Sequence, residues 1–267
     1  MSIHTQCEGA VAVVTLCAPE SMNALTIPDL VLLREQLRQL QDDDAIRCIV
    51  ITGDGSKAFC TGANLKDTLP PSTPFTKGNL LGRSAEASRD GYTRLIDFSD
   101  LEIWKPMIAA INGYCLGGGL ELALQSDLRI ASDRASFGLP EVKVASIPAC
   151  GGVQQLLRAI PSAHAMKLAL TGDRIDAQKA LSIGLVSDVV PESELLDEVM
   201  KVALRIAENG PLAVQVVKRL AIETSHLAPR DFIGQSNLQW GLLRDSSDRI
   251  EGRRAFAEKR KPVFNGA

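Results

Sequence analysis

The sequence predicts an α/β protein in which residues 1–190 form a core of strands and helices and residues 191–267 form an all-helical segment. Short apolar runs rich in β-branched residues alternate with segments of helical periodicity as far as Val190. The runs are apolar throughout, which is typical of strands in a sheet that is covered on both faces. After Pro191 the strand-like runs stop, so the remaining chain is predicted to be helical.

The first part of the core predicts two strands and a helix. Residues 10–16 (AVAVVTL) are short, apolar and β-branched, as expected of a strand. Residues 28–41 predict a helix because leucines recur at spacings of three and four, with Pro28 in the first turn and Thr26 as a cap. Residues 46–52 predict a second strand, which the glycines at 53 and 55 end.

The later elements follow from the same patterns. In the core we expect a surface loop at 70–74, helices at 84–98 and 120–125, and strands at 106–111 and 128–131. Beyond the core we expect helices at 192–209, 212–225, 231–244 and 246–259. The last four are amphipathic, so each must bury one face against the core or against another copy of the chain.

Composition limits the class of protein. The chain is 45% hydrophobic and 23% charged, which supports a large core, and its net charge of −3 lacks the excess of basic residues typical of a nucleic-acid binder. No apolar run reaches the roughly 20 residues of a membrane span, and the first residues do not resemble a secretory signal. The six cysteines contain no C-x-x-C pair, so we expect reduced, buried thiols. These features predict a soluble, cytoplasmic protein with neither nucleic-acid nor membrane partners.

Three consecutive glycines, Gly117 to Gly119, join a predicted strand to a predicted helix. Glycine lets backbone amides approach a ligand closely, and the amides at a helix start are unpaired at the positive end of the helix dipole. Such a turn can stabilise a developing oxyanion, and Glu121 would lie on the first helical turn beside it. A phosphate-binding turn or a tight packing turn is the alternative, although Leu122 breaks the G-x-G-x-x-G pattern.

Two further segments carry weaker signals. Residues 57–66 (KAFCTGANLK) follow a predicted strand, and Gly62-Ala63 could offer another free amide, although from this segment alone an ordinary strand-to-helix turn is the better explanation. In residues 136–141 (SFGLPE), Pro140 fixes a loop that presents Glu141. An isolated glutamate in a loop is usually solvated, so this segment alone predicts no site.

Together, these segments resemble the signature of the enoyl-CoA hydratase (crotonase) family. AFCTGANLK resembles its first oxyanion-hole loop, INGYCLGGGLELAL its second, and FGLPEVKVASIPACGG its second catalytic-glutamate segment. The similarity begins at Asn23-Ala24-Leu25 and continues through LTGDRIDAQKALSIGLVSDVV to EGRRAFAEKRKPVF. The resemblance implies a crotonase-like spiral of β-β-α units with a C-terminal helical layer. It also implies association into trimers or dimers of trimers through residues 191–267.

The resemblance implies roles for particular residues. The amides of Ala63 and Gly118 would form the oxyanion hole for the thioester carbonyl, and Glu121 and Glu141 would be the catalytic pair. Glu121 would act mainly on the water, and Glu141 on the proton at the α-carbon. The implied substrate-binding residues are Ala24, Ala63, Asn64, Leu65, Lys66, Gly118 and Ala149. Coenzyme A would enter as part of the substrate, so no separate cofactor and no metal are expected, and the three histidines form no ligand-like cluster.

Presence of both glutamates favours an enoyl-CoA hydratase, which adds water reversibly across the 2,3 double bond in fatty-acid or related acyl-CoA degradation. An enoyl-CoA isomerase, or a specialised acyl-CoA dehydratase or hydrolase of the same family, is the alternative. Asn64 and Ala149 replace an Asp and a Gly that are common in the family. Residues 70–90, which match the family least, are expected to line the acyl pocket.

Overall fold

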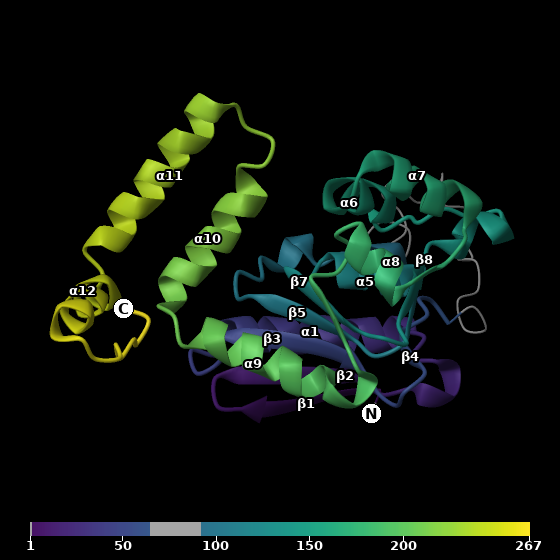
Figure 1. Cartoon of the computed structure of the whole chain (residues 1–267), viewed down its shortest axis with the longest axis horizontal. Coiled ribbons are helices and arrows are strands. Elements are labelled where there is room, and N and C mark those ends of the chain that lie inside the picture. The colour runs from purple at the N-terminus through teal and green to yellow at the C-terminus, as the bar shows by residue number, and fades with distance from the viewer. Residues whose placement is uncertain (1, 65–91) are drawn as a thin grey trace, which may run out of the picture.

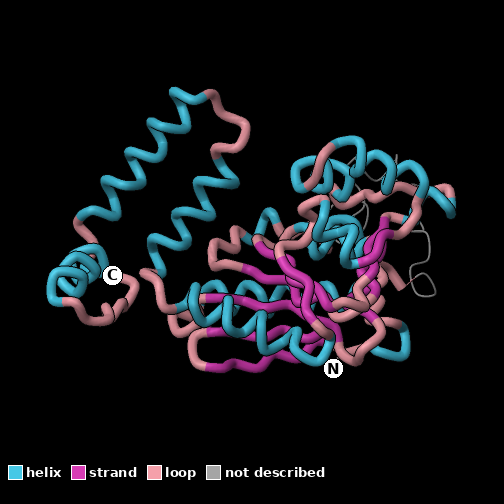
Figure 2. Tube along the Cα trace, in the orientation of Figure 1, coloured by secondary structure: helices cyan, strands magenta, loops and turns pink. Residues whose placement is uncertain are grey.

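The larger of two sheets forms the centre of the molecule (Figures 1 and 2). The computed structural model describes residues 2–64 and 92–267. In that part the larger sheet has the strand order β1-β2-β3-β5-β7-β10. Its strands are β1 (Ile3–Glu8), β2 (Val11–Leu16), β3 (Cys48–Gly53), β5 (Met107–Ile111), β7 (Leu128–Ser132) and β10 (Asp188–Val190). All neighbours run parallel except β1 and β2, which are antiparallel.

A smaller sheet of short strands has the order β4-β6-β8-β9. Its strands are β4 (Ala58–Cys60), β6 (Tyr114–Leu116), β8 (Ser136–Gly138) and β9 (Ile175–Asp176). Successive strands alternate between the sheets, since β3 is followed by β4, β5 by β6 and β7 by β8. Each turn of the chain therefore adds one strand to each sheet, which confirms the predicted α/β fold and its spiral arrangement.

The predicted strands at 10–16, 46–52, 106–111 and 128–131 are confirmed as β2, β3, β5 and β7. Strand β1 was not predicted. It is an edge strand in which only Ile3 is buried, so its sequence IHTQCE has no apolar run.

One face of the larger sheet packs against α1 (Ile27–Asp42), which confirms the predicted helix and its cap. The Asp29 N–H donates to Thr26 Oγ1 at 3.3 Å, and the Thr26 N–H donates to Asp29 Oδ2 at 2.8 Å. This reciprocal cap satisfies amides that the first helical turn leaves unpaired. The leucines that predicted this helix are buried in one cluster with alternate residues of β2 and β3; they are Leu30, Leu33, Leu37 and Leu40.

The opposite face packs against α9 (Leu195–Ala207), which crosses the sheet in Figure 1. Val199 and Ala203 of α9 lie in one buried cluster with Val50 and Ile108 of the sheet. Side chains of a strand alternate between its faces, so β3 and β5 must be apolar on both. This explains why their sequences are apolar throughout.

The remaining helices surround the smaller sheet or follow the last strand. They are α4 (Tyr92–Leu95), α5 (Gly118–Leu124), α6 (Gly152–Ala159), α7 (Ser162–Thr171), α8 (Ala177–Ser182), α10 (Pro211–Glu223), α11 (Pro229–Arg244) and α12 (Ser247–Glu258). Short 3-10 helices occur at η1 (Pro19–Ser21), η2 (Ser99–Leu101), η3 (Pro140–Val144) and η4 (Glu192–Glu194). The predicted loop at 70–74 lies outside the described residues, as does the first part of the predicted helix at 84–98.

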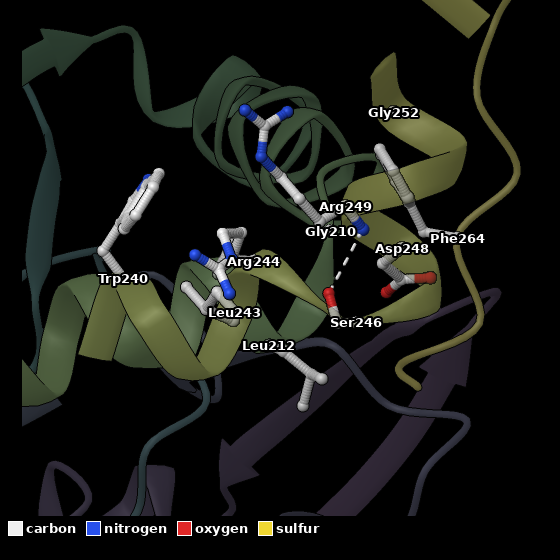
Figure 3. Close-up of a pocket in the computed structure, with 11 residues that line it drawn as sticks. Gly210, Leu212, Trp240, Leu243, Arg244, Ser246, Asp248, Arg249, Gly252 and Phe264 are labelled. Carbon is white, nitrogen blue, oxygen red and sulfur yellow. Dashed lines mark hydrogen bonds between the residues drawn. The ribbon is translucent and has the colours of Figure 1, made fainter. Parts of the chain in front are cut away.

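Only helices follow β10 in the described structure, as predicted, and α10 to α12 extend away from the sheets (Figure 1). Ser246 caps α12 by accepting a hydrogen bond from the Arg249 N–H at 3.2 Å (Figure 3). Leu212, Trp240 and Phe264 line a hollow between these three helices and the C-terminal residues (Figure 3). None of the described helices is long and apolar enough to cross a bilayer.

All six cysteines are free. Cys48, Cys60, Cys115 and Cys150 are buried, as predicted. The prediction of burial is wrong for Cys7, which is exposed near the end of the edge strand β1, and Cys17 is only partly buried.

Candidate active site

The glycine turn brings the start of α5 against the end of β4. Gly117 has φ 55° and ψ −129°, a conformation that a side chain would strain. A Cβ atom there would also lie 3.0 Å from Glu141 Oε1. A Cβ atom at Gly119 would lie only 2.0 Å from the Cys60 carbonyl oxygen. Glycine is therefore required both for the turn and for the close contact between α5 and β4.

The second predicted amide lies beside this turn. Leu25 and Ala63 form an isolated parallel bridge, in which the Leu25 N–H donates to the Gly62 carbonyl at 2.8 Å and the Asn64 N–H donates to the Leu25 carbonyl at 3.0 Å. In a parallel bridge the residue between these two bonds directs its own N–H to the other side. A Cβ atom at Gly62 would lie 2.8 Å from the Gly118 nitrogen. The structure thus brings Ala63 and Gly118 close together.

Glu121 lies on the first turns of α5 and is only 2% exposed. Its Oε1 accepts hydrogen bonds from the Cys150 N–H at 2.8 Å and the Gly152 N–H at 3.0 Å. Burial raises the pKa of Glu121, and these two hydrogen bonds partly oppose that rise because they favour the ionised carboxylate. The side chain is held in one orientation by main-chain groups.

Glu141 lies on the 3-10 helix η3, directly after Pro140, and is partly buried. Its Oε2 is buried and has no hydrogen-bond partner among the described residues. Burial raises the pKa of Glu141, and the nearby charge of Glu121 raises it further. A solvated loop glutamate, the ordinary interpretation of this sequence, is therefore excluded.

The other predicted substrate-contact residues differ in their burial and in their distance along the chain from the glycine turn. Ala24 is buried beside the Leu25–Ala63 bridge, and Asn64 follows that bridge. Ala149 is exposed and directly precedes Cys150. Leu65, Lys66 and the predicted acyl-pocket residues 70–90 all lie outside the described residues, so their contacts stay predictions.

Sequence reasoning missed the two amides that bind Glu121. Cys150 and Gly152 flank Gly151, which has φ 84° and lies immediately before α6. Paired glycines before a helix were the available signal, since they mark a turn that exposes amides. No group of three or more His, Cys, Asp or Glu side chains within residues 2–64 and 92–267 could hold a metal ion.

Comparison with known proteins identifies the family. A family model for enoyl-CoA hydratase/isomerase matches residues 6–267. The chain is 46% identical to (E)-benzylidenesuccinyl-CoA hydratase of Thauera aromatica, with 100% of both chains covered. It is 36% identical to carnitinyl-CoA dehydratase of Proteus mirabilis, over 99% of this chain and 98% of that protein. The crystal structure of an enoyl-CoA hydratase from Bacillus anthracis matches with a TM-score of 0.90 and 35% identity over 100% of both chains.

The chain belongs to the enoyl-CoA hydratase/isomerase family. The resemblance inferred from the ordered motifs is thereby confirmed, and so is the expectation of a hydratase, which is an enzyme of the hydro-lyase class. In this enoyl-CoA hydratase/isomerase family member, a buried carboxyl group, a partly buried one and two neighbouring amide-bearing turns meet at one place. The roles of the individual residues are argued below from that geometry.

Proposed function

We propose that the enzyme adds water reversibly across the 2,3 double bond of a 2-enoyl-CoA thioester, in fatty-acid or related acyl-CoA degradation. The supporting observation is the pair of carboxyl groups, Glu121 and Glu141, whose pKa values are both raised by burial beside the glycine turn. Two neighbouring carboxyls with raised pKa values can share one proton near neutral pH. One then acts as a base while the other acts as an acid, which is what hydration of a double bond requires.

The amides of Ala63 and Gly118 are proposed to bind the thioester carbonyl oxygen. As water attacks the β-carbon, electrons move through the double bond and negative charge gathers on this oxygen. Preorganised amide donors stabilise such charge, and removing one donor in other enzymes costs about 3 kcal/mol of transition-state stabilisation. The close approach of Gly62 to the Gly118 nitrogen favours this arrangement, because it brings both donors to one oxygen.

The hydrogen bonding of the two glutamates favours different roles in proton transfer. Glu121 is fixed by two N–H donors, which favour its ionised form, so it is suited to orient water and accept a proton. Glu141 has a buried oxygen without a partner, so it holds a proton more readily and is suited to protonate the α-carbon. Ala24, Asn64, Leu65, Lys66 and Ala149 are proposed as further substrate contacts, and coenzyme A enters as part of the substrate without a separate cofactor.

Turnover of enoyl-CoA thioesters tests the proposal directly. Loss of the conjugated-thioester absorbance is followed with crotonyl-CoA, a medium-chain and a branched enoyl-CoA, and an aryl-substituted one. The aryl substrate is included because the Thauera aromatica relative is named for such a compound. Absence of turnover with all four would exclude the hydratase proposal. Movement of the double bond without gain of water would favour the isomerase alternative.

Glu121→Gln and Glu141→Gln test the two carboxyl groups. Each removes a titratable proton while keeping the size of the side chain, so we expect kcat to fall by about 100-fold or more. Glu8→Gln is the matched control, because Glu8 is exposed at the end of the edge strand β1 and should leave kcat unchanged. Full activity in both active-site variants would exclude the proposed roles.

We also propose that the enzyme forms trimers or dimers of trimers through its C-terminal helices. Several large apolar side chains of α10 to α12 are exposed in the single chain: Val217, Ile222, Leu238, Trp240, Leu242 and Phe256. Apolar surface of this extent is typical of an association face. A second copy of the chain would bury it.

A further inference from the structure

A buried tyrosine hydroxyl beside the glycine turn has no role in the chemistry described above. Tyr92 opens α4, and its Oη is buried without a hydrogen-bond partner among the described residues. Burying a hydroxyl without a partner costs about 1–3 kcal/mol, and native structures contain few such groups. Phenylalanine would fill nearly the same space without this cost, so packing alone does not explain the oxygen.

The hydroxyl lies where the two amide-bearing turns meet. A Cβ atom at Gly118 would lie 2.5 Å from Tyr92 Oη and 3.3 Å from the Gly62 Cα. A Cβ atom at Gly62 would in turn lie 2.8 Å from the Gly118 nitrogen. One small region therefore contains Tyr92 Oη, Gly118 and Gly62. That region also contains the proposed site of the thioester oxygen.

The surroundings keep the hydroxyl protonated. Burial raises the pKa of Tyr92 well above its ordinary value, and nearby Cys60, Cys150, Glu121 and Glu141 raise it further because a phenolate beside them would be repelled. A tyrosine with a raised pKa keeps its O–H at every pH at which the glutamates can work. It can therefore donate a hydrogen bond without giving up its proton to the substrate.

We propose that Tyr92 is a third donor of the oxyanion hole. Its hydroxyl donates a hydrogen bond to the thioester carbonyl oxygen, beside the amides of Ala63 and Gly118, and the proton stays on Oη throughout. The missing partner of the buried hydroxyl is then supplied by the substrate. This inference rests on the proposed function, because it assigns Tyr92 to the same carbonyl oxygen.

Tyr92→Phe removes only the donor. Because the charge on the oxygen is greatest in the transition state, we expect kcat for enoyl-CoA hydration to fall by about 10-fold to 100-fold while KM changes by less than about 3-fold. Tyr114→Phe is the matched control. Tyr114 is the only other tyrosine of the chain, is 38% exposed and lies under the Arg174 guanidinium rather than in the site. It should leave kcat unchanged.

A spectroscopic readout separates donation from packing. A bound enoyl-CoA with a para-dialkylamino-cinnamoyl group absorbs at longer wavelength as its carbonyl oxygen is more strongly polarised. We expect this red shift in the wild-type enzyme and in Tyr114→Phe, and a smaller shift in Tyr92→Phe at saturating probe, with the melting temperature of each variant measured alongside.

An undiminished red shift in Tyr92→Phe, with or without a change in kcat, would overturn the inference. If the wild-type enzyme hydrates an enoyl-CoA, that result leaves the proposed function standing and removes only Tyr92 from the hole. If the wild-type enzyme neither binds the probe nor hydrates any enoyl-CoA, the proposed function fails and the inference fails with it.

Discussion

At the scale of single residues, Glu121 combines deep burial with an ionisable group. Its folded-state pKa is raised by burial, whereas in the unfolded chain it titrates near its ordinary value. Ionisation is thus less favourable in the folded protein. The corresponding contribution to stability is fully present below the unfolded pKa and is lost as the pH rises through the folded pKa. As the pH rises above the unfolded-state pKa, the buried carboxyl group of Glu121 therefore makes the fold progressively less stable.

Glu121→Gln is accordingly expected to raise the melting temperature at pH 7. The neutral amide oxygen can still accept the hydrogen bonds from Cys150 and Gly152, while the buried charge is gone. A stability gain of 1 kcal/mol corresponds to roughly 2–4 °C in a protein of this size class. Thermal unfolding of both proteins at pH 7 and pH 4 is the measurement, and the difference should shrink at pH 4. A variant that melts at a lower temperature than wild type at both pH 7 and pH 4 would contradict the argument. Glu8→Gln, at an exposed position, should change the melting temperature at neither pH.

At the scale of elements, the turn from β6 into α5 depends on a backbone conformation that only glycine adopts without strain. Gly117→Ala is expected to lower stability by about 1–3 kcal/mol, since it places a Cβ at positive φ. It should also lower kcat, because the new Cβ would lie 3.0 Å from Glu141 Oε1 and displace that carboxyl. Chemical denaturation and steady-state kinetics measure the two effects.

Gly241→Ala provides the matched control for this substitution. Gly241 lies within α11, and a Cβ atom there meets nothing within 4 Å. Alanine is favoured over glycine in a helix interior by about 1 kcal/mol, so this variant should be slightly more stable and equally active. Equal effects of the two substitutions would show that the turn imposes no special constraint.

Local patterns predicted most elements because β3, β5, α1 and the C-terminal helices each carry an uninterrupted apolar run or a helical period. Edge strand β1 has no such pattern. It forms a strand because its backbone pairs with β2, and a local sequence pattern does not show that pairing. The short strands of the smaller sheet span only two or three residues, too few to show a period.

The site was less accessible to sequence reasoning. Glu121 and Cys150, which are 29 residues apart, meet only after the chain has completed a turn of the spiral. Glu141 gave no local signal, and only the ordered family motifs singled it out. Tyr92 gave no signal at all, because its chemical setting consists of two glycines from other turns.

At the scale of the whole molecule, the exposed apolar residues of α10 to α12 predict association. Leu242→Glu on α11 should shift the enzyme toward monomers, because the charge would have to be buried in the proposed contact. Leu170→Glu on α7 adds the same charge at a side chain of equal exposure, since both leucines are 69% exposed. It should leave the assembly intact.

Light scattering coupled to size-exclusion chromatography measures the mass of wild type and both variants. A wild-type enzyme that is monomeric at micromolar concentration would exclude the proposed association. Equal dissociation by both substitutions would show that the contact is not confined to the C-terminal helices.

The position of α9 has a consequence for how the protein folds. One face of the larger sheet is covered by residues 195–207, although β2 and β3 are complete by Gly53. Arg47 makes a further contact between these distant segments, since its Nη1 donates to the carbonyl of Ala207, the last residue of α9, at 3.1 Å. Contacts between segments so distant in sequence slow folding and leave apolar surface open meanwhile. During synthesis of the chain, one apolar face of this sheet stays exposed to solvent until α9 has left the ribosome. Chaperones that bind exposed apolar strands would act during that interval.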